Sequence, residues 1–214
     1  MKINFNKTKV ILFNPFTFLQ FKPDFHIDSH KLSVEDQVKL LGVTISSNMK
    51  WNAHIEDMVT RANKKLWILR RLSFLGASQT DLLDIYTKQI RSILEYAVPA
   101  WHGSTSQADK CDIERVQKSA CHIILGKKYI GYSNALTVLG LEPLEVRRIG
   151  LCLKFALKAE THPKFQTWFK PAVQNRVLRP RNKKYVSVKS YSERFTSSPI
   201  SYLTDLLNSH YSKL

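Results

Sequence analysis

The sequence predicts an α+β protein that is mainly α: a small N-terminal β element followed by a bundle of about four helices and a basic tail. Two patterns carry this prediction. Before about residue 46, short apolar runs alternate with turn signals, as in strands. From Asn52 onward, apolar residues recur at steps of three and four, as on the buried face of a helix. With 214 residues, 43% of them hydrophobic, the chain can form a real core.

The N-terminal β-rich segment, residues 1–46, contains three candidate strands. The first, Val10–Phe13, is a fully apolar run that ends at a turn signal, so we expect it to be buried. The other two are Phe25–Ile27 and Val38–Ile45, and residues 46–48 supply a turn before the helices.

The helical segment, residues 47–162, has four long apolar stripes and a short additional one. Asn52 is a candidate N-cap for the first helix, and Gly76 can end it because glycine adopts the left-handed conformation easily. The other helices are expected to start near Ser78, Ala108, Asn134 and Pro143.

Residues 163–214 are expected to form a basic, partly disordered tail, because the apolar period fades there and cations dominate. The stretch Tyr202–Leu207 is an exception, since its apolar residues can form a short terminal helix. We therefore expect this part to contribute little to the core.

Charge is the most unusual property of the chain. It contains 33 Lys and Arg against 17 Asp and Glu, a formal net charge of +16. Such an excess favours a polyanionic partner, either nucleic acid or an anionic membrane surface, and a solvated basic protein without a specific partner is the simpler alternative. No apolar run approaches the roughly 20 residues of a membrane span, so we expect no membrane partner.

The expected location is intracellular, cytoplasmic or nuclear. The apolar run near the N-terminus lacks the small-residue cleavage site of a signal peptide. Three irregularly spaced cysteines, Cys111, Cys121 and Cys152, fall on apolar-periodic stretches, where a reduced cysteine acts as a small hydrophobic residue. This use of cysteine suits a reducing compartment.

No catalytic residue and no metal ligand is predicted. The sequence lacks the glycine-rich nucleotide loops, the nucleophile elbow and the H-E-x-x-H zinc motif. Cys121 and His122 are adjacent rather than spaced as metal ligands are. The chain also lacks two adjacent aspartates, the pair that would hold two Mg²⁺ ions for nucleotide transfer.

The candidate nucleic-acid-binding residues are cations. Four lie beside the apolar stripe of the first long helix, where they can follow a phosphate backbone: Arg61, Lys64, Lys65 and Arg71. Four more lie in the tail: Arg179, Arg181, Lys183 and Lys184. The alternative for the helix is a merely solvated face. Three tryptophans are interpreted as core or interface residues rather than as platforms for bases: Trp67, Trp101 and Trp168.

Six stretches between about Asn4 and Asn208 follow a recognisable order: NFNKTKVILFNP, VKLLGVTISSNMKWNAHI, IYTKQIRSILEYAVPAW, DIERVQKSACHIILG, LGLEPLEVRRIGLCLKFALK and SSPISYLTDLLN. Together they resemble the C-terminal part of the reverse transcriptases of LINE-type (non-LTR, jockey-like) retrotransposons. The resemblance implies the end of the palm, the thumb and the C-terminal extension of an RNA-directed DNA polymerase, with RNA, DNA or their hybrid as partner.

The resemblance also implies roles for a few residues. A primer-grip-like hairpin, which supports the primer end, would contain Leu40, Leu41 and Gly42. Trp51 and His54 would lock the joint between this hairpin and a basic thumb helix. The family's catalytic aspartates, which bind Mg²⁺, lie upstream of the N-K-T segment. We therefore expect a truncated element product, inactive alone, with no cofactor in this chain and with the upstream polymerase region as a potential partner.

A second resemblance covers residues 43–75, which look like the short domain named after the N-terminal region of AlkB homologue 8, a tRNA-modifying dioxygenase and methyltransferase. Neither a two-His-one-carboxylate iron site nor a glycine-rich cofactor loop is visible in the sequence. Three hypotheses stay open: a nucleic-acid-gripping polymerase fragment, a tRNA-modification protein, and a non-enzymatic helical interaction module.

Overall fold

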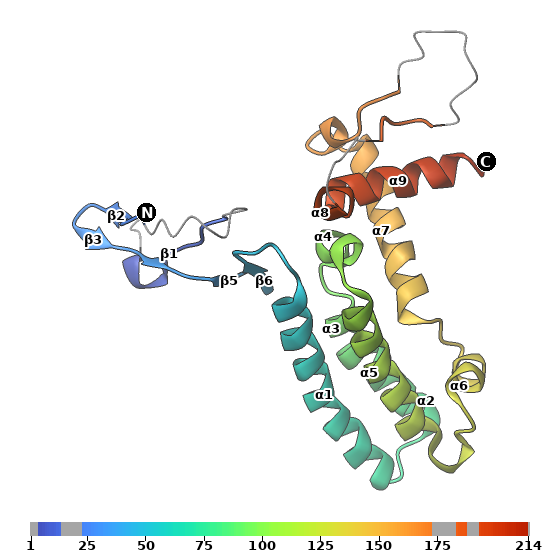
Figure 1. Cartoon of the computed structure of the whole chain (residues 1–214). Helices are drawn as coiled ribbons and strands as arrows, with labels where there is room; N and C mark the ends of the chain where they lie inside the picture. The colour runs from blue at the N-terminus through green and yellow to red at the C-terminus, as the bar shows by residue number, and fades with distance from the viewer. Residues whose placement is uncertain (1–3, 14–22, 173–182, 188–192, 214) are drawn as a thin grey trace. The chain divides into compact units, whose positions relative to one another are not determined.

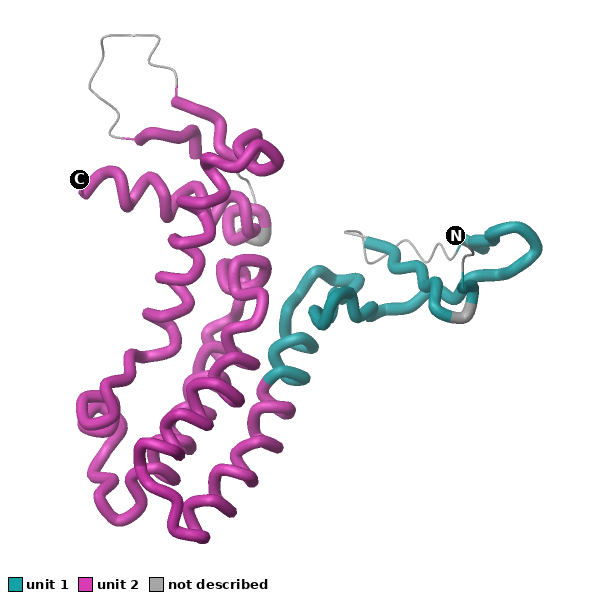
Figure 2. The backbone as a smooth tube through the Cα atoms, turned by 180° about the vertical axis from the view of Figure 1, so that it is seen from behind, with its two compact units in different colours: residues 1–58 teal, residues 59–214 magenta. Residues whose placement is uncertain are grey.

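The computed structural model describes residues 4–13, 23–172, 183–187 and 193–213 (Figure 1). Short N-terminal strands precede a series of helices, which confirms the mainly helical α+β class. The chain divides into two compact units, Met1–Met58 and Val59–Leu214 (Figure 2). The division falls inside the first long helix, α1 (Asn52–Phe74).

The strands of the first unit are short and paired two by two. β1 (Lys9–Val10) pairs in parallel with β4 (Ser33–Val34), and a single turn η1 (Phe5–Lys7) precedes it. Two antiparallel pairs follow: β2 (His26–Ile27) with β3 (His30–Lys31), and β5 (Gln37–Leu40) with β6 (Val43–Ser46). The prediction of a buried strand over Val10–Phe13 is wrong, since strand β1 ends at Val10 and Phe13 is 50% exposed. Without a larger sheet to cover them, these apolar residues stay partly exposed.

The predicted strand Val38–Ile45 is in fact a tight hairpin. Leu41 and Gly42 connect β5 to β6, and both have positive φ values, +48° and +83°. Two successive positive φ values are typical of the type I′ turn, whose twist matches that of the flanking strands. Gly42 adopts such a φ at no steric cost, whereas Leu41 adopts it against the preference of a residue with a Cβ atom.

The joint between β6 and α1 is fastened by His54. Its side chain is fully buried, and its Nδ1 accepts a hydrogen bond of 3.3 Å from the backbone N–H of Thr44. The Trp51 ring meets the imidazole edge-on, with 6.2 Å between the ring centroids. An ion pair of 3.0 Å between Lys39 and Asp57 adds a second tie between hairpin and helix. The expectation that His54 is a structural joint residue is confirmed.

The described elements of the second unit are helices, apart from an isolated β-bridge between Pro171 and Tyr185. After α1, its elements are α2 (Gln79–Ile85), the π-helix η2 (Tyr86–Arg91), α3 (Ser92–Leu94), α4 (Val98–Trp101), η3 (His102–Ser104), α5 (Gln107–Leu125), η4 (Gly126–Lys128), α6 (Tyr132–Leu139), α7 (Leu144–Thr161), η5 (Gln166–Trp168), α8 (Glu193–Thr196) and α9 (Pro199–Tyr211) (Figure 1). The second predicted helix is therefore one segment, α2–η2–α3, with a π-helical middle.

Serine caps set two of the helix starts. The Ser78 hydroxyl accepts a 3.2 Å hydrogen bond from the backbone N–H of Asp81 at the start of α2. Ser106 does the same for Asp109 at the start of α5, also at 3.2 Å. Such caps satisfy backbone donors that have no partner within the helix, and the acidic residue complements the positive end of the helix dipole.

Trp101 is the largest side chain of the core. It is fully buried, as predicted, and its indole N–H donates a 2.9 Å hydrogen bond to the carbonyl of Tyr96. Ala97 adopts a left-handed conformation between α3 and α4, with φ of +52°. This reversal allows the chain to fold Trp101 back towards the end of the preceding helix.

The C-terminal part contributes more to the core than the sequence suggests. Helix α9 packs on α7 and buries Leu203 and Leu207 almost completely. The Asn208 amide both accepts from the backbone N–H of Tyr185 at 2.9 Å and donates to its carbonyl at 3.0 Å. The terminal helix is thus confirmed, and the expectation of little core after Pro163 is wrong. The local sequence does not indicate this burial, because the segments that cover these residues lie far apart in the chain.

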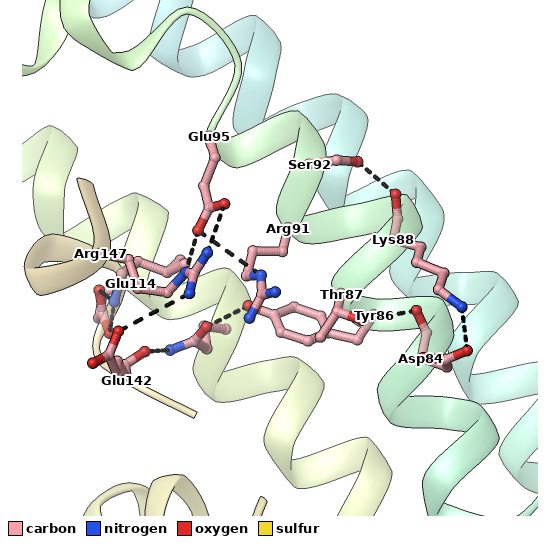
Figure 3. A network of polar contacts seen from close by, with 12 residues as sticks. Asp84, Tyr86, Thr87, Lys88, Arg91, Ser92, Glu95, Glu114, Glu142 and Arg147 are labelled. Atoms are coloured by element: carbon pink, nitrogen blue, oxygen red, sulfur yellow. Dashed lines mark hydrogen bonds and ion pairs between the residues drawn. The ribbon is translucent and has the colours of Figure 1, made fainter. Parts of the chain in front are cut away.

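A buried polar network joins α2–η2, α5, α6 and the start of α7 (Figure 3). At its centre is Gln117, a fully buried residue of α5. Its carbonyl oxygen accepts from the hydroxyl of Tyr86, and its amide donates to the hydroxyl of Tyr132 at 2.8 Å and to the carbonyl of Glu142 at 2.9 Å. Burial raises the pKa of Tyr86 well above its usual range, so the hydroxyl keeps the proton that it donates.

Two carboxylates extend the network. Glu114 accepts from the hydroxyl of Tyr132 and from the backbone N–H of Leu144, with N–O distances of 3.1 and 3.2 Å, and so caps α7. Glu95 receives two hydrogen bonds from the Arg147 guanidinium, of 2.6 and 3.2 Å (Figure 3). These bonds raise the pKa of Arg147. Side chains from four separate elements therefore provide hydrogen-bond partners for one another.

Gln117→Leu is expected to destabilise the protein by about 2–4 kcal/mol, because each buried polar group left without a partner costs about 1–3 kcal/mol. The variant has a similar volume but cannot bond to Tyr86 or to the Glu142 carbonyl. Chemical denaturation monitored by circular dichroism measures the effect. The control is Gln79→Leu, at an exposed position of α2, which should change the free energy of unfolding by less than about 0.5 kcal/mol. Equal effects of the two variants would show that the network adds nothing to stability.

Candidate nucleic-acid interface

The long basic stretch of α1 contains no acidic residue. Between Asp57 and Asp81 the sequence has five cations, Arg61, Lys64, Lys65, Arg70 and Arg71, and no Asp or Glu. One face of the helix is held in the core by Ala62, Leu66 and Leu69, which are almost completely buried. The positive charges therefore lie on a helix whose orientation within the second unit is fixed by packing.

The four predicted cations of α1 do not share one environment. Lys64 and Arg71 are exposed and lie seven residues apart, hence on the same outer face of the helix. Arg61 and Lys65 are half-buried at the edge of the packed face. The Lys65 ammonium donates a 3.0 Å hydrogen bond to the side-chain carbonyl of Gln89 on η2. The outer face thus brings together Lys64 and Arg71, while Lys65 also ties α1 to its neighbour.

Two large aromatic side chains lie on the same outer face. Trp67 is 65% exposed and Phe74 is 81% exposed, and the Arg71 guanidinium carbon lies 5.9 Å from the centroid of the Phe74 ring. Of the two interpretations of Trp67, core or interface residue, the first is therefore wrong, and the second stays a prediction. Its position off the buried stripe, seven residues before Phe74, is the sequence signal that could have revealed this exposed pair.

The candidate cations of the tail fall in two groups. Arg179 and Arg181 lie outside the described residues. Lys183 and Lys184 are exposed, and the Lys183 ammonium donates to the Ser187 hydroxyl at 3.0 Å. Lys184 lies 3.5 Å from a carboxylate oxygen of Glu160.

Lys184 has a structural role in addition to its charge. Its ammonium lies 3.8 Å from the centroid of the Tyr211 ring, and the interaction with the Tyr211 side chain, followed by the charge of Glu160, raises the pKa of Lys184. The hydroxyl of Tyr185 also donates to Glu160, at 2.7 Å. Lys184 therefore helps to join the segment around Tyr185 to α7 and α9.

The primer-grip-like residues form the end of the β5–β6 hairpin in the first unit. Leu40 is the last residue of β5, and Leu41 and Gly42 form the turn. The Leu41 side chain is 84% exposed. An apolar side chain is thus presented at the tip of a hairpin whose second strand is bonded to His54 at Thr44.

A buried basic pair lies between α4, η3, α7 and α9. Arg148 of α7 is fully buried, and among the described residues its guanidinium has no hydrogen-bond partner. The carboxylates that act on it electrostatically are engaged by other groups: Glu114 by the Tyr132 hydroxyl and the Leu144 N–H, Glu145 by Lys110 at 2.9 Å, and Glu95 by Arg147. Burial lowers the pKa of Arg148, as expected for a cation removed from water.

His102 is the second member of this pair. It is nearly fully buried, and its ring meets the Tyr202 ring edge-on, with 5.7 Å between centroids. Burial, followed by the positive charge of Arg148, lowers the pKa of His102 to about 4. Neither side chain reaches the surface, so neither can contact a phosphate group in this conformation.

The cysteines are reduced and differ in exposure. Cys111 is exposed on α5, whereas Cys121 and Cys152 are buried, where burial raises the thiol pKa to about 11 and about 12 respectively. Only two of the three therefore act as small core residues. Within the described ranges, no cluster of three or more His, Cys, Asp or Glu residues could hold a metal ion. None of the described helices is long and apolar enough to cross a membrane.

Comparisons with known proteins give no further guidance. A scan against protein-family models, a search of curated proteins and a search of solved structures each found no match for this chain. The resemblances to retroelement reverse transcriptases and to the AlkB homologue 8 domain therefore stay predictions.

The stability of the protein should depend on the protonation of His102. The folded state keeps this residue neutral down to about pH 4, whereas the unfolded chain protonates it below about pH 6.5. The unfolded state thus binds more protons within this window, and the free energy of unfolding should fall as the pH drops through it. A depression of the pKa from 6.5 to about 4 corresponds to a loss of about 3 kcal/mol.

The measurement is the free energy of unfolding of wild type and His102→Gln at several pH values between 7.5 and 4. The variant has no titrating group at this position, so its stability should depend less on pH. The charged groups that act on His102 are Arg148, Lys110 and Glu145, and all remain in the variant. His122→Gln, at an exposed position, is the control and should keep the wild-type dependence. Parallel curves for wild type and His102→Gln would contradict the prediction.

Proposed function

We propose that this chain grips nucleic acid by its phosphates, as a fragment of a retroelement RNA-directed DNA polymerase that has no nucleotide-transfer activity alone. The observation that carries the proposal is the outer face of α1, where Lys64 and Arg71 are exposed on a helix segment that contains no acidic residue. The net charge of +16 supports the same class of partner.

The geometry suits backbone contacts. Lys64 and Arg71 are separated by about 10.5 Å along the axis, since a helix rises about 1.5 Å per residue. The opposite face is anchored by buried residues, so the two cations are held on a rigid element rather than on a loop. Contacts of this kind bind and orient the phosphate backbone but do not read the sequence.

The wider assignment rests on the six stretches that resemble the reverse transcriptases. They favour a polymerase fragment over an isolated basic module. They imply two partners: an RNA, DNA or hybrid duplex, and the upstream polymerase region. A location in the cytoplasm or the nucleus follows from this partner.

Binding should be nearly independent of sequence and steeply dependent on salt, because each neutralised phosphate releases counterions. Lys64→Ala/Arg71→Ala should weaken binding to all duplexes alike and reduce the slope of log K against log salt by about one to two, since each contact contributes about 0.9 on B-form DNA. Fluorescence anisotropy titrations on an RNA–DNA hybrid and on duplex DNA at several salt concentrations measure the slope.

The matched control for this experiment is Lys154→Ala/Lys158→Ala, which removes two exposed charges from α7. It should reduce the slope less than the α1 variant. Should the α1 variant keep the wild-type slope on both substrates, the outer face of α1 is only solvated and the proposal is wrong.

The 214-residue chain should not extend a primer. Its sequence lacks adjacent aspartates, and a polymerase needs carboxylates to hold its two metal ions. The assay is extension of a primed RNA template by the purified chain with Mg²⁺ or Mn²⁺, with an active reverse transcriptase as positive control. Extension by this chain above the background of the Lys64→Ala/Arg71→Ala variant would refute the prediction.

A further inference from the structure

The outer face of α1 alternates cations and aromatic rings. Lys64, Trp67, Arg71 and Phe74 follow one another at steps of three, four and three residues, so all four lie on one side of the helix. Among the described residues, Trp67 and Phe74 are the two most exposed aromatic side chains of the protein. We define these four residues as the aromatic–cationic stripe.

Large exposed aromatic rings indicate a binding surface, because covering them removes apolar surface from water. The opposite face of α1 is occupied by the core, and the rings point away from it, so packing within the second unit does not account for them. Ile68 and Leu75 are also more than a third exposed beside the stripe. The ligand must therefore offer apolar surface together with negative charge.

Charge complementarity selects the class of ligand. No acidic residue accompanies the stripe, since none occurs between Asp57 and Asp81. A strand with unpaired bases supplies both required features, because its phosphates are negative and the faces of its bases are free to stack. A duplex supplies the phosphates only, since its bases are stacked on one another inside the helix.

The spacing of the stripe is compatible with a nucleic-acid strand. Trp67 and Phe74 are separated by about 10.5 Å along the helix axis. A strand with stacked bases, at about 3.4 Å per nucleotide, covers that length in about three steps. Arg71 lies between Trp67 and Phe74 in the order of the stripe, and its guanidinium carbon is 5.9 Å from the Phe74 ring centroid, so it can meet the phosphate of a nucleotide stacked there.

We propose that the aromatic–cationic stripe of α1 binds unpaired nucleotides, with bases stacked on Trp67 and Phe74 and with phosphates held by Lys64 and Arg71. This inference rests on the proposed function and adds to it the class of nucleic acid that this face prefers. The binding is independent of sequence, because every base has a face that can stack on an aromatic ring.

The test uses the full chain and three probes: oligo(dT) of 20 nucleotides, a 20-base-pair DNA duplex, and vesicles with anionic phosphatidylserine. Trp67→Leu/Phe74→Leu keeps apolar bulk but removes the rings. It should weaken binding to oligo(dT) by about tenfold or more, change duplex binding by less than about twofold, and leave the salt slope unchanged. Because both positions are exposed, its denaturation midpoint should equal that of wild type.

Two further measurements separate stacking from general apolar contact. Trp67→Tyr/Phe74→Tyr retains aromatic rings and should bind oligo(dT) within about threefold of wild type. Oligo(dT) should quench tryptophan fluorescence in wild type, and the quenching should decrease strongly in Trp67→Leu, since Trp67 is the most exposed of the four tryptophans: Trp101 is buried, and Trp51 and Trp168 are only partly exposed.

The outcomes are distinguishable. Absence of binding to every nucleic acid by wild type overturns the proposed function and this inference with it. Wild-type affinity of the leucine variant for oligo(dT), or an equal loss on duplex and single strand, overturns this inference alone. Vesicle binding that depends on the rings, together with ring-independent binding of oligo(dT), would instead assign the stripe to a lipid surface and would also overturn it.

Discussion

The fold of the second unit depends on one buried amide. Gln117 is fully buried, its side-chain oxygen accepts from Tyr86 of η2, and its side-chain nitrogen donates to Tyr132 of α6 and to the carbonyl of Glu142 before α7. If any of these hydrogen bonds were missing, the network would be less stable than an apolar core, because the low dielectric inside a protein makes each unpaired polar group costly. The positions of the π-helix, of α6 and of the start of α7 are therefore specified together. Apolar contacts alone would permit α5 to slide or rotate between its neighbours, whereas the network permits one arrangement.

Three of the stretches that resemble reverse transcriptases supply residues to this network. Tyr86 and Glu95 come from IYTKQIRSILEYAVPAW, Glu114 and Gln117 from DIERVQKSACHIILG, and Arg147 from LGLEPLEVRRIGLCLKFALK. These polar residues take part in hydrogen bonds inside the unit, so the three stretches contribute to the packing of its helices. On the surface of the second unit, α1 presents a face where positive charge and exposed aromatic rings coincide.

Much of the architecture could be predicted from the sequence, because long helices are indicated by the spacing of their apolar residues and by their capping residues. The bounds of α1 and α5 and the burial of Trp101 follow from such local signals, whereas the joint role of His54 was implied by the resemblance to reverse transcriptases. The hairpin turn at Leu41 was less visible, since a leucine is not the residue that a positive φ favours. The packing of α9 on α7 could not be predicted, because it depends on contacts between segments that are far apart in the chain.

The positive charge of the candidate site could be predicted from the sequence, but the exposure of its individual side chains could not. The sequence placed Arg61, Lys64, Lys65 and Arg71 in one group. The structure separates the exposed pair Lys64 and Arg71 from the half-buried Arg61 and Lys65, of which Lys65 bonds to Gln89. Charge alone also gave no reason to regard Trp67 as a surface residue, since a tryptophan among apolar neighbours usually lies in the core. The distinction matters for specificity. The stripe contains cations and rings but no carboxamide or carboxylate that could pair with adenine or cytosine edges. Under the proposed function, such a surface would hold a strand by its phosphates and by the faces of its bases, with little discrimination among adenine, cytosine and thymine.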